Sequence, residues 1–368
     1  MKKWIDEFKI KRLDRYIIAK FLGTYFFAIA LIIAIIVVFD YNENIDKFAT
    51  SNAPLKAIIF DYYLNYVPHL ANMFSALFVF IAVIYFTSKL AETSEIIAMF
   101  AAGVSFKRLL RPYMISAAII AVMTYILGAY IIPNGNKTRM EFEVKHKRRD
   151  VVESAGNIQL QVNDSTVAYF DRYDSRTRTG YRFSLDKFLD KKLVSHMTAR
   201  TITYHPEEKH KWTVKNWMIR ELGDDKEVIR SNTRTPLDTI IKIEPGDFLI
   251  SEGQQETMTS PQLSDYIDKQ KARGIANIKG FEIEYHKRIA MSFAAFILTI
   301  IGASLSSKKT KGGMGLSLGI GLGLSFSYIL FQAISSAFAE QMPVVIAVWL
   351  PNIVYSFIAI YLYKKAPK

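Results

Sequence analysis

The chain contains no cysteine among its 368 residues. A disulfide framework, a thiolate metal site and a cysteine nucleophile are therefore excluded, although this absence does not fix the cellular compartment. The sequence has no Gly-x-x-x-x-Gly-Lys-Ser/Thr motif, so the chain does not hydrolyse nucleotides in the P-loop manner. It also has neither His-Glu-x-x-His nor the Cys/His spacing of a zinc site. We therefore expect no cofactor and no metal.

Long uncharged stretches are what the chain has in excess. Hydrophobic residues make up 51% of it and aromatic residues 13%. An α-helix needs about 20 apolar residues to cross ~30 Å of hydrocarbon. Six runs are near or above that length, at residues 21–39, 62–88, 112–133, 289–307, 312–339 and 341–363. The first run is too long for a signal-peptide core and lacks a cleavage site after it. The sequence therefore predicts an α-helical polytopic membrane protein with six transmembrane helices.

The distribution of charge predicts which side each segment faces. The net charge is +13. A polar insert at residues 134–288 holds 28 basic and 24 acidic residues, and the remainder holds 19 and 10. Of those 19 basic residues, 17 lie in segments 1–20, 87–112, 307–313 and 364–368, which the positive-inside rule places in the cytoplasm. Both termini are then cytoplasmic, whereas the insert and the 40–57 loop lie outside. Topology accounts for the basic balance, so nucleic-acid binding is not indicated.

The insert divides into a helical part and a β part. Residues 134–152 are highly charged and predict a helical continuation of the third span into water. Alternating apolar residues then predict seven to nine short strands within residues 157–251, which favours an antiparallel β-sandwich or jelly roll. The predicted strands are 158–162, 166–170, 181–189, 193–204, 211–222, 239–243 and 248–250. A helix at 262–273 and a return segment at 280–288 follow. The domains are thus 1–133, 134–288 and 289–368, with a basic amphipathic lead-in at 1–20.

The stretch at residues 88–112 is polar and lies between two apolar runs. It predicts a surface helix of about two turns, at residues 95–100, with Glu95 in its first turn and Gly103 as its stop. Pro112 is expected at the start of the next helix. A glutamate on a short cytoplasmic helix suits docking to a soluble motor through a charge-assisted pair. A solvated helix turn without a partner explains the same pattern equally well.

Two further patterns are open to a functional interpretation. Gly315, Gly319, Gly323 and Ser327 recur every four residues in the fifth span, and such small residues allow a second helix to approach closely. Residues 315–319 also fit the Gly-x-Ser-x-Gly motif of serine hydrolases, with His69 as the only intramembrane histidine. A membrane helix is the wrong context for that motif, and the two residues are expected near opposite faces. We therefore expect a structural or cavity-lining role for His69.

Several segments of the chain together resemble the LptF/LptG (YjgP/YjgQ) permeases of the lipopolysaccharide-export ABC transporter. The resemblance extends over nearly the whole length, and it includes the three-plus-three helix layout with a periplasmic insert. Its residues are Leu13-Asp-Arg-Tyr-Ile17, Val67-Pro68, Ser94-Glu-Ile96, Met99, Ala102, Gly103 and Leu350-Pro351. Both halves of the permease pair fit the sequence, and residues 13–17 favour the LptG-like half.

The resemblance implies a non-catalytic permease subunit in a bacterial inner membrane. Its implied partners are an LptB-like ATPase dimer, a second LptF/LptG-type permease, an LptC-like periplasmic bridge protein and lipopolysaccharide itself. ATP binding to the ATPase would close the cavity between the two permeases and drive the lipid towards the periplasmic jelly rolls. The coupling helix would lie at about residues 88–111. Its residues that would contact the ATPase are Glu95, Ile96, Met99, Phe100 and Gly103, and Gly315, Gly319 and Gly323 would line the gate between subunits.

One departure from the family pattern concerns the outer end of the first helix. The LptG branch has several lysines there, which would meet lipid phosphates, whereas this chain has Lys47 together with Asp40 and Asp46. The resemblance therefore implies a phosphate site at Lys47, shared with or shifted to Lys56, Lys137 or Arg139. A lipid A with fewer phosphates would explain the departure.

A function of another class remains open on the residues alone. A membrane receptor or sensor would bind a ligand with its β-domain and dock a signalling protein on residues 88–112. Lipoprotein-extracting ABC permeases fit less well, because they have four spanning helices and carry the insert after the first.

Overall fold

A computed structural model describes residues 11–147, 154–223, 226–248, 253–272, 278–307 and 313–366. Most of the lead-in expected at residues 1–20, and the basic turn at 308–312, lie outside these residues. The chain forms two compact units. One comprises Met1–Lys147, Glu256–Ser260 and Phe281–Lys368, and the other comprises Arg148–Gln255 and Pro261–Gly280. We call them the helical unit and the β unit.

Six helices of the described chain are long and apolar enough to cross a membrane, as the sequence predicts. The first, α2, spans Arg12–Thr50, and it continues well beyond the apolar run at 21–39. The expected outer loop at 40–57 is therefore wrong for its first eleven residues, which are helical. They carry charged side chains, and hydropathy locates the part of a helix inside hydrocarbon rather than its end.

The second span is built from several pieces. After α3 (Leu55–Ala57) and a π-helical turn, η1 (Ile58–Tyr63), the chain forms α4 (Leu64–Met73) and α5 (Ser75–Glu92). The two longer helices meet at Phe74, so the single helix expected at 62–88 is interrupted. Pro68 lies inside α4 and, together with the π turn, is the kind of feature that bends a helix.

The third span continues into the insert as predicted, but its helix ends at His146, and residues 148–152 of the predicted continuation lie outside the description. It consists of α7 (Phe106–Ile126), η2 (Leu127–Ile131) and α8 (Ile132–His146). The expectation that Pro112 begins this span is wrong. Ser105 is the N-cap, because its hydroxyl accepts a hydrogen bond from the Arg108 amide at 3.3 Å, and this cap starts the helix at Phe106.

The remaining spans are α10 (Lys279–Ser306), α11 (Gly313–Ala337) and α12 (Val344–Lys365), with η5 (Phe338–Glu340) between the last two. Pro351 lies inside α12 and cannot donate to the carbonyl of Ala347. The hydroxyl of Ser335 in α11 donates to that carbonyl instead. The side-chain amide of Asn352 further joins α12 to α10, donating to the Ala290 carbonyl at 2.8 Å.

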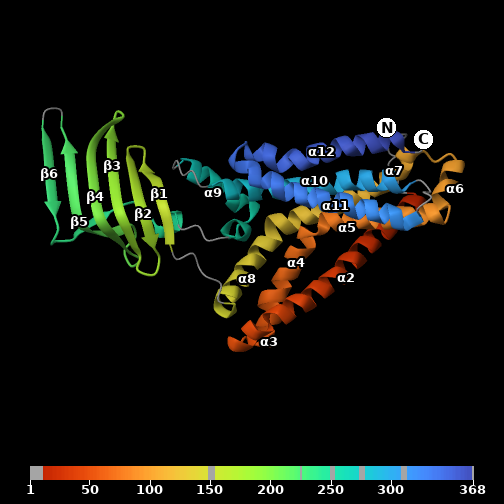
Figure 1. Ribbon diagram of the computed structural model, residues 1–368, viewed down its shortest axis with the longest axis horizontal. Helices are drawn as coiled ribbons and strands as arrows, with labels where there is room; N and C mark the ends of the chain where they lie inside the picture. The colour runs from red at the N-terminus through yellow and green to blue at the C-terminus, as the bar shows by residue number, and fades with distance from the viewer. Residues whose placement is uncertain are drawn as a thin grey trace. The chain divides into compact units, whose positions relative to one another are not determined.

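The β unit contains one antiparallel sheet whose strands follow one another in chain order from β1 to β6 (Figure 1). Strand β7 pairs with β5 beside β6. The strands are β1 (Ser154–Asn163), β2 (Thr166–Asp174), β3 (Thr179–Leu189), β4 (Lys192–His205), β5 (Lys211–Leu222), β6 (Glu227–Asn232) and β7 (Leu237–Ile240). The inserted antiparallel domain is thus confirmed. Its described strands form a meander, rather than the two sheets of a sandwich or the crossing connections of a strict jelly roll.

Aromatic side chains fill the core of the sheet. Trp212 is fully buried, and it packs against Phe170, Tyr173 and Tyr204 with ring centroids 5.0–6.3 Å away. Its indole N–H donates to the Ile243 carbonyl at 3.1 Å, which fastens the segment after β7 over the sheet. That segment was expected to be strand up to residue 243, but pairing ends at Ile240. The short helices η3 (Pro245–Asp247), η4 (Gln254–Thr257) and α9 (Ser260–Ala272) follow, and residues 249–250 of the last predicted strand lie outside the description.

Candidate functional site

The segment between the second and third spans contains a separate short helix, α6 (Glu95–Ala101). Ser94 precedes it in the left-handed conformation, with φ 61° and ψ 10°. Gly103 follows it at φ 84°, where a residue without a side chain is favoured, and the amide of Val104 closes the helix end on the Met99 carbonyl at 3.0 Å. The predicted surface helix is therefore present, bounded by two sharp turns.

Glu95 is exposed at the start of α6 and is held by two hydroxyl groups. The hydroxyl of Thr93 donates to one carboxylate oxygen at 3.2 Å, and the hydroxyl of Tyr16 in α2 donates to the other at 3.3 Å. The carboxylate is thus open to solvent, and the two hydroxyls restrict its orientation. A cationic side chain of a partner can reach it without opening a buried contact.

The other residues predicted on this helix divide into two groups. Ile96 is fully buried in the core of the helical unit, and Met99 and Phe100 are half-buried against the same core. Gly103 is exposed, with no atom within 4 Å of the position a Cβ would take. Ile97, which the sequence did not single out, is 47% exposed and supplies the apolar part of the outer face. Ile96 therefore anchors α6, whereas Glu95 and Ile97 are available to a partner.

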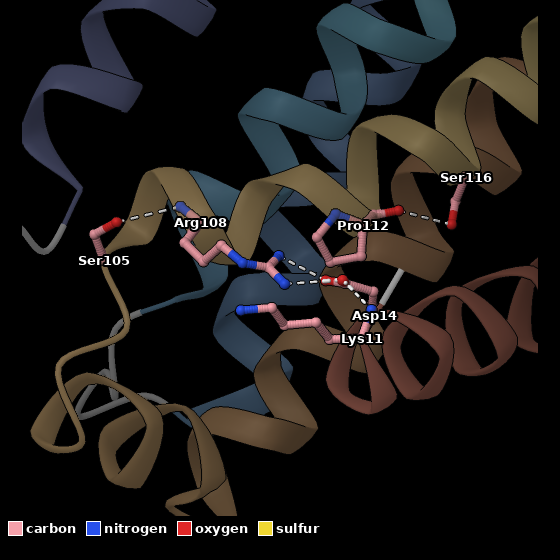
Figure 2. Close-up of polar contacts among 6 residues, drawn as sticks. All are labelled: Lys11, Asp14, Ser105, Arg108, Pro112 and Ser116. Carbon is pink, nitrogen blue, oxygen red and sulfur yellow. Dashed lines mark hydrogen bonds and ion pairs between the residues drawn. The ribbon is translucent and has the colours of Figure 1, made fainter. Parts of the chain in front are cut away.

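The start of α2 is joined to the start of α7. The guanidinium of Arg108 binds the Asp14 carboxylate through two hydrogen bonds of 2.6 and 2.8 Å (Figure 2). The Asp14 side chain is 2% exposed and that of Arg108 is 27% exposed. The sequence motif at 13–17 contained Asp14, and Arg108 was one of the basic residues counted in segment 87–112. Their pairing was missed, because nothing local in the sequence relates residues 94 positions apart.

The four cations proposed for lipid phosphates lie on three elements of the helical unit. Lys47 in α2, Lys56 in α3 and Lys137 in α8 are exposed. Arg139 is buried; its guanidinium lies 5.2 Å from the Tyr66 ring centroid and 3.9 Å from the carboxylate of Glu143. The exposed lysines are therefore accessible to a ligand, while Arg139 is engaged within the chain.

Asp40 has a structural role in the C-terminal part of α2. Its carboxylate accepts hydrogen bonds from the hydroxyls of Tyr62 at 3.2 Å and Tyr63 at 3.0 Å. These two tyrosines belong to η1, so Asp40 ties the π turn to α2. An acidic residue at this position is thus explained by the tyrosines that it binds.

Comparison with known protein families assigns this chain to one of them. The family model for the lipopolysaccharide export system permease LptF/LptG matches residues 15–365. The chain belongs to the LptF/LptG family. A search of curated proteins found no match. As a family member, it is a multi-pass inner-membrane permease for lipopolysaccharide export, and it is a transport subunit rather than an enzyme.

The glycine pattern of this LptF/LptG permease faces outward. Gly315, Gly319 and Gly323 in α11 are exposed, and no atom of the described chain lies within 4 Å of the place where a Cβ would stand. Gly321 faces the other way, because a Cβ there would stand 2.1 Å from the Ile84 Cδ1 of α5. Gly321 therefore allows α11 to pack on α5 within the permease, while the predicted stripe is left open.

The serine-hydrolase motif has no catalytic geometry in the permease. Ser317 lies within the continuous helix α11, rather than on a turn between a strand and a helix. His69 instead lines a cavity of about 170 Å³ in the helical unit, together with Asn72, Asn136 and Arg288. Arg288 is buried and binds the Glu284 carboxylate at 2.8 Å and the Met258 carbonyl at 2.9 Å. A cavity-lining place for His69 is as expected.

Proposed function

We propose that this permease is one membrane half of an ABC transporter that extracts lipopolysaccharide from the outer leaflet of the inner membrane. In this proposal an LptB-like ATPase dimer binds α6, a second LptF/LptG-type permease faces the chain across a lipid-binding cavity, and an LptC-like periplasmic protein receives the lipid. Hydrolysis takes place on the separate ATPase subunit.

The observation that carries the proposal is the outward-facing carboxylate of Glu95 on an anchored short helix. Ile96 fixes α6 in the core, and Tyr16 and Thr93 orient the carboxylate, so that a partner meets a pre-positioned charge. Binding to a preorganised group loses less conformational entropy than binding to a mobile side chain. The chain has no P-loop motif of its own, which supports the use of a separate motor.

The placement of basic residues supports the orientation that we propose. Lys89, Lys107 and Arg111 surround α6 along the chain, and Lys364 and Lys365 end α12. Under the positive-inside rule these segments are cytoplasmic and the β unit is periplasmic. In this orientation α6 is accessible to an ATPase in the cytoplasm, and the sheet is accessible to a bridge protein in the periplasm.

Lys47 is the cation that we assign to lipid phosphate. Replacing Lys47 by alanine is expected to reduce photo-crosslinking of the permease to lipopolysaccharide by roughly tenfold, as loss of a charge-assisted hydrogen bond would. Lys89→Ala is the matched control. It removes an exposed lysine at the C-terminal end of α5, near the membrane face opposite to the one where we place Lys47. Unchanged crosslinking in Lys47→Ala would count against this assignment.

The two faces of α11 predict opposite outcomes for neighbouring glycines. Gly319→Leu adds bulk to the open stripe, so it is expected to leave the fold intact and to reduce co-purification of the second permease. Gly321→Leu overpacks the contact with Ile84 and is expected to cost about 1–3 kcal/mol of stability. Thermal unfolding in detergent and the yield of the paired permease measure the two effects. Normal pairing of Gly319→Leu would show that the stripe faces lipid.

Purification of the tagged permease from its own membranes tests the proposal as a whole. An exporter is expected to co-elute with a nucleotide-binding subunit and a second six-helix permease. In proteoliposomes the complex should hydrolyse ATP at a rate that responds to lipopolysaccharide. A receptor or sensor would instead elute without an ATPase, and lipopolysaccharide would leave hydrolysis unaffected; that result would reject the exporter.

A further inference from the structure

The Asp14–Arg108 pair is a fixed joint between two helix starts. The Asp14 carboxylate caps its own helix by accepting the Lys11 amide at 2.9 Å, and it also receives both hydrogen bonds from Arg108 (Figure 2). Arg108 lies in the first turn of α7, which Ser105 caps. A bidentate arginine–carboxylate pair fixes orientation as well as distance. The first turns of α2 and α7 are therefore held in one geometry.

Stability alone gives a weak reason for such a pair. Removing the Asp14 carboxylate from water has a desolvation cost, which pairing with the partly exposed Arg108 offsets, and apolar side chains of similar volume often replace a buried ion pair without loss of stability. A directional pair instead specifies how two elements are placed, which apolar contact does less strictly. The location of the Asp14–Arg108 pair therefore indicates which helices it orients.

The pair lies where α6 joins the rest of the helical unit. Only residues 102–105 separate α6 from α7, so the joint holds the corner that these two helices form. The same end of α2 contacts α6 directly, through the hydrogen bond from Tyr16 to Glu95. The first turns of α2 therefore contact both helices of the corner: Tyr16 contacts α6 and Asp14 contacts α7. With both contacts in place, α6 and α7 have little freedom to move without α2.

The helix α2 is continuous over 39 residues, from the joint to the outer residues that include Lys47. The second span differs, because it is interrupted at Phe74 and contains a π turn. A continuous helix moves as one body, whereas an interrupted one bends at its break. Displacement of the α6–α7 corner therefore reaches the outer end of the unit through α2.

We propose that Asp14 and Arg108 are positioning residues that make α2 move together with the α6–α7 corner. In transport they would convert movement of α6 into movement at the outer end of α2. This second statement rests on the proposed function, because it takes the ATPase as the source of the movement. The mechanical statement concerns this chain alone.

A distance measurement tests the mechanical statement without any partner. The chain has no native cysteine, so spin labels at Ala98→Cys in α6 and Lys20→Cys in α2 report one distance between exposed sites. The distance distribution is expected to be narrow with the native pair and clearly broader in Asp14→Asn. Asparagine retains an acceptor for the Lys11 amide, so this variant removes the charge and leaves the helix cap. Lys107→Gln, which removes an exposed charge from the same turn, should leave the distribution unchanged.

A coupling measurement tests the transport statement in the reconstituted exporter. Asp14→Asn is expected to lower the amount of lipopolysaccharide moved per ATP hydrolysed by roughly 3- to 30-fold, the range for a residue that couples two sites, with hydrolysis itself retained. Arg108→Lys keeps the charge and loses the bidentate geometry, so it should lower the same ratio. The double variant Asp14→Asn/Arg108→Gln should be no worse than Asp14→Asn alone or Arg108→Gln alone, because the two residues act as one unit.

The outcomes separate the two statements. An unchanged distance distribution in both Asp14→Asn and Arg108→Lys overturns the joint. A parallel loss of hydrolysis and transport, with a constant ratio, reduces the pair to a contribution to folding and overturns its positioning role. If the native permease retains no ATPase but the variants still broaden the distance, the proposed exporter fails while the joint stands.

Discussion

Glu95→Ala is expected to lower the affinity of the permease for its ATPase subunit by roughly 30-fold or more, the usual result of removing one partner of an interfacial charge pair. The alanine variant keeps Ile96 in the core, so the thermal unfolding of the permease should change little. Binding of the purified ATPase to the permease in nanodiscs measures the first effect, and lipopolysaccharide transport should fall with it.

Glu92→Ala provides the matched control for this experiment. Glu92 is also exposed and acidic, and it lies three residues earlier, at the end of α5. Glu95→Gln is a second useful variant, because its amide oxygen still accepts from one of the two hydroxyls and its NH2 group can donate to the other, while the side chain carries no charge. Normal assembly and transport in Glu95→Ala would mean that the carboxylate only faces solvent, without a partner.

Trp212→Ala is expected to destabilise the β unit by about 3–5 kcal/mol, the usual cost of deleting a buried tryptophan from a core. The side chain is fully buried among three aromatic rings, and its N–H holds the Ile243 carbonyl. Hydrogen exchange of the full-length protein should show faster exchange of the backbone amides in β2 to β5, with the helices of the helical unit unaffected.

Trp217→Ala separates this core effect from the mere loss of a tryptophan. Trp217 lies on the same strand but is only half-buried, and its N–H reaches the Thr235 carbonyl at 3.2 Å. Its replacement should accelerate exchange much less. Equal acceleration in both variants would contradict the assignment of Trp212 as the centre of the core.

The periodicity of the sequence predicted the elements of this fold where burial is one-sided or complete. Strands β2 to β5 alternate between more and less buried residues over part of their length, and the predicted segments overlap all four. Strand β6 was missed because five of its six residues are exposed, so no alternation marks it. The C-terminal part of α2 was missed for a similar reason, since residues 40–50, which include four charged side chains, continue the helix after the apolar run has ended.

The sequence predicted the residues of the candidate site only where the residue types within one short segment are enough to indicate the structure. Glu95 and Gly103 have local signatures, a carboxylate in a first helix turn and a glycine after a helix end. Tyr16 and Asp14 have none, because their partners lie 79 and 94 residues away in the chain. Contacts of that kind depend on how the helices pack, which one sequence does not specify residue by residue.

The length of α2 carries Lys47 beyond the apolar run of the first span. Lys47 lies eight residues beyond Phe39, the last residue of the apolar run, which corresponds to about 12 Å along a helix. The headgroup layer on each side of a bilayer is only about 5–7 Å thick. If Lys47 binds a lipid phosphate, that lipid has already risen above its neighbours in the leaflet. Such a contact would then hold a partly extracted molecule, and selection of the lipid at rest in the membrane would fall to other side chains.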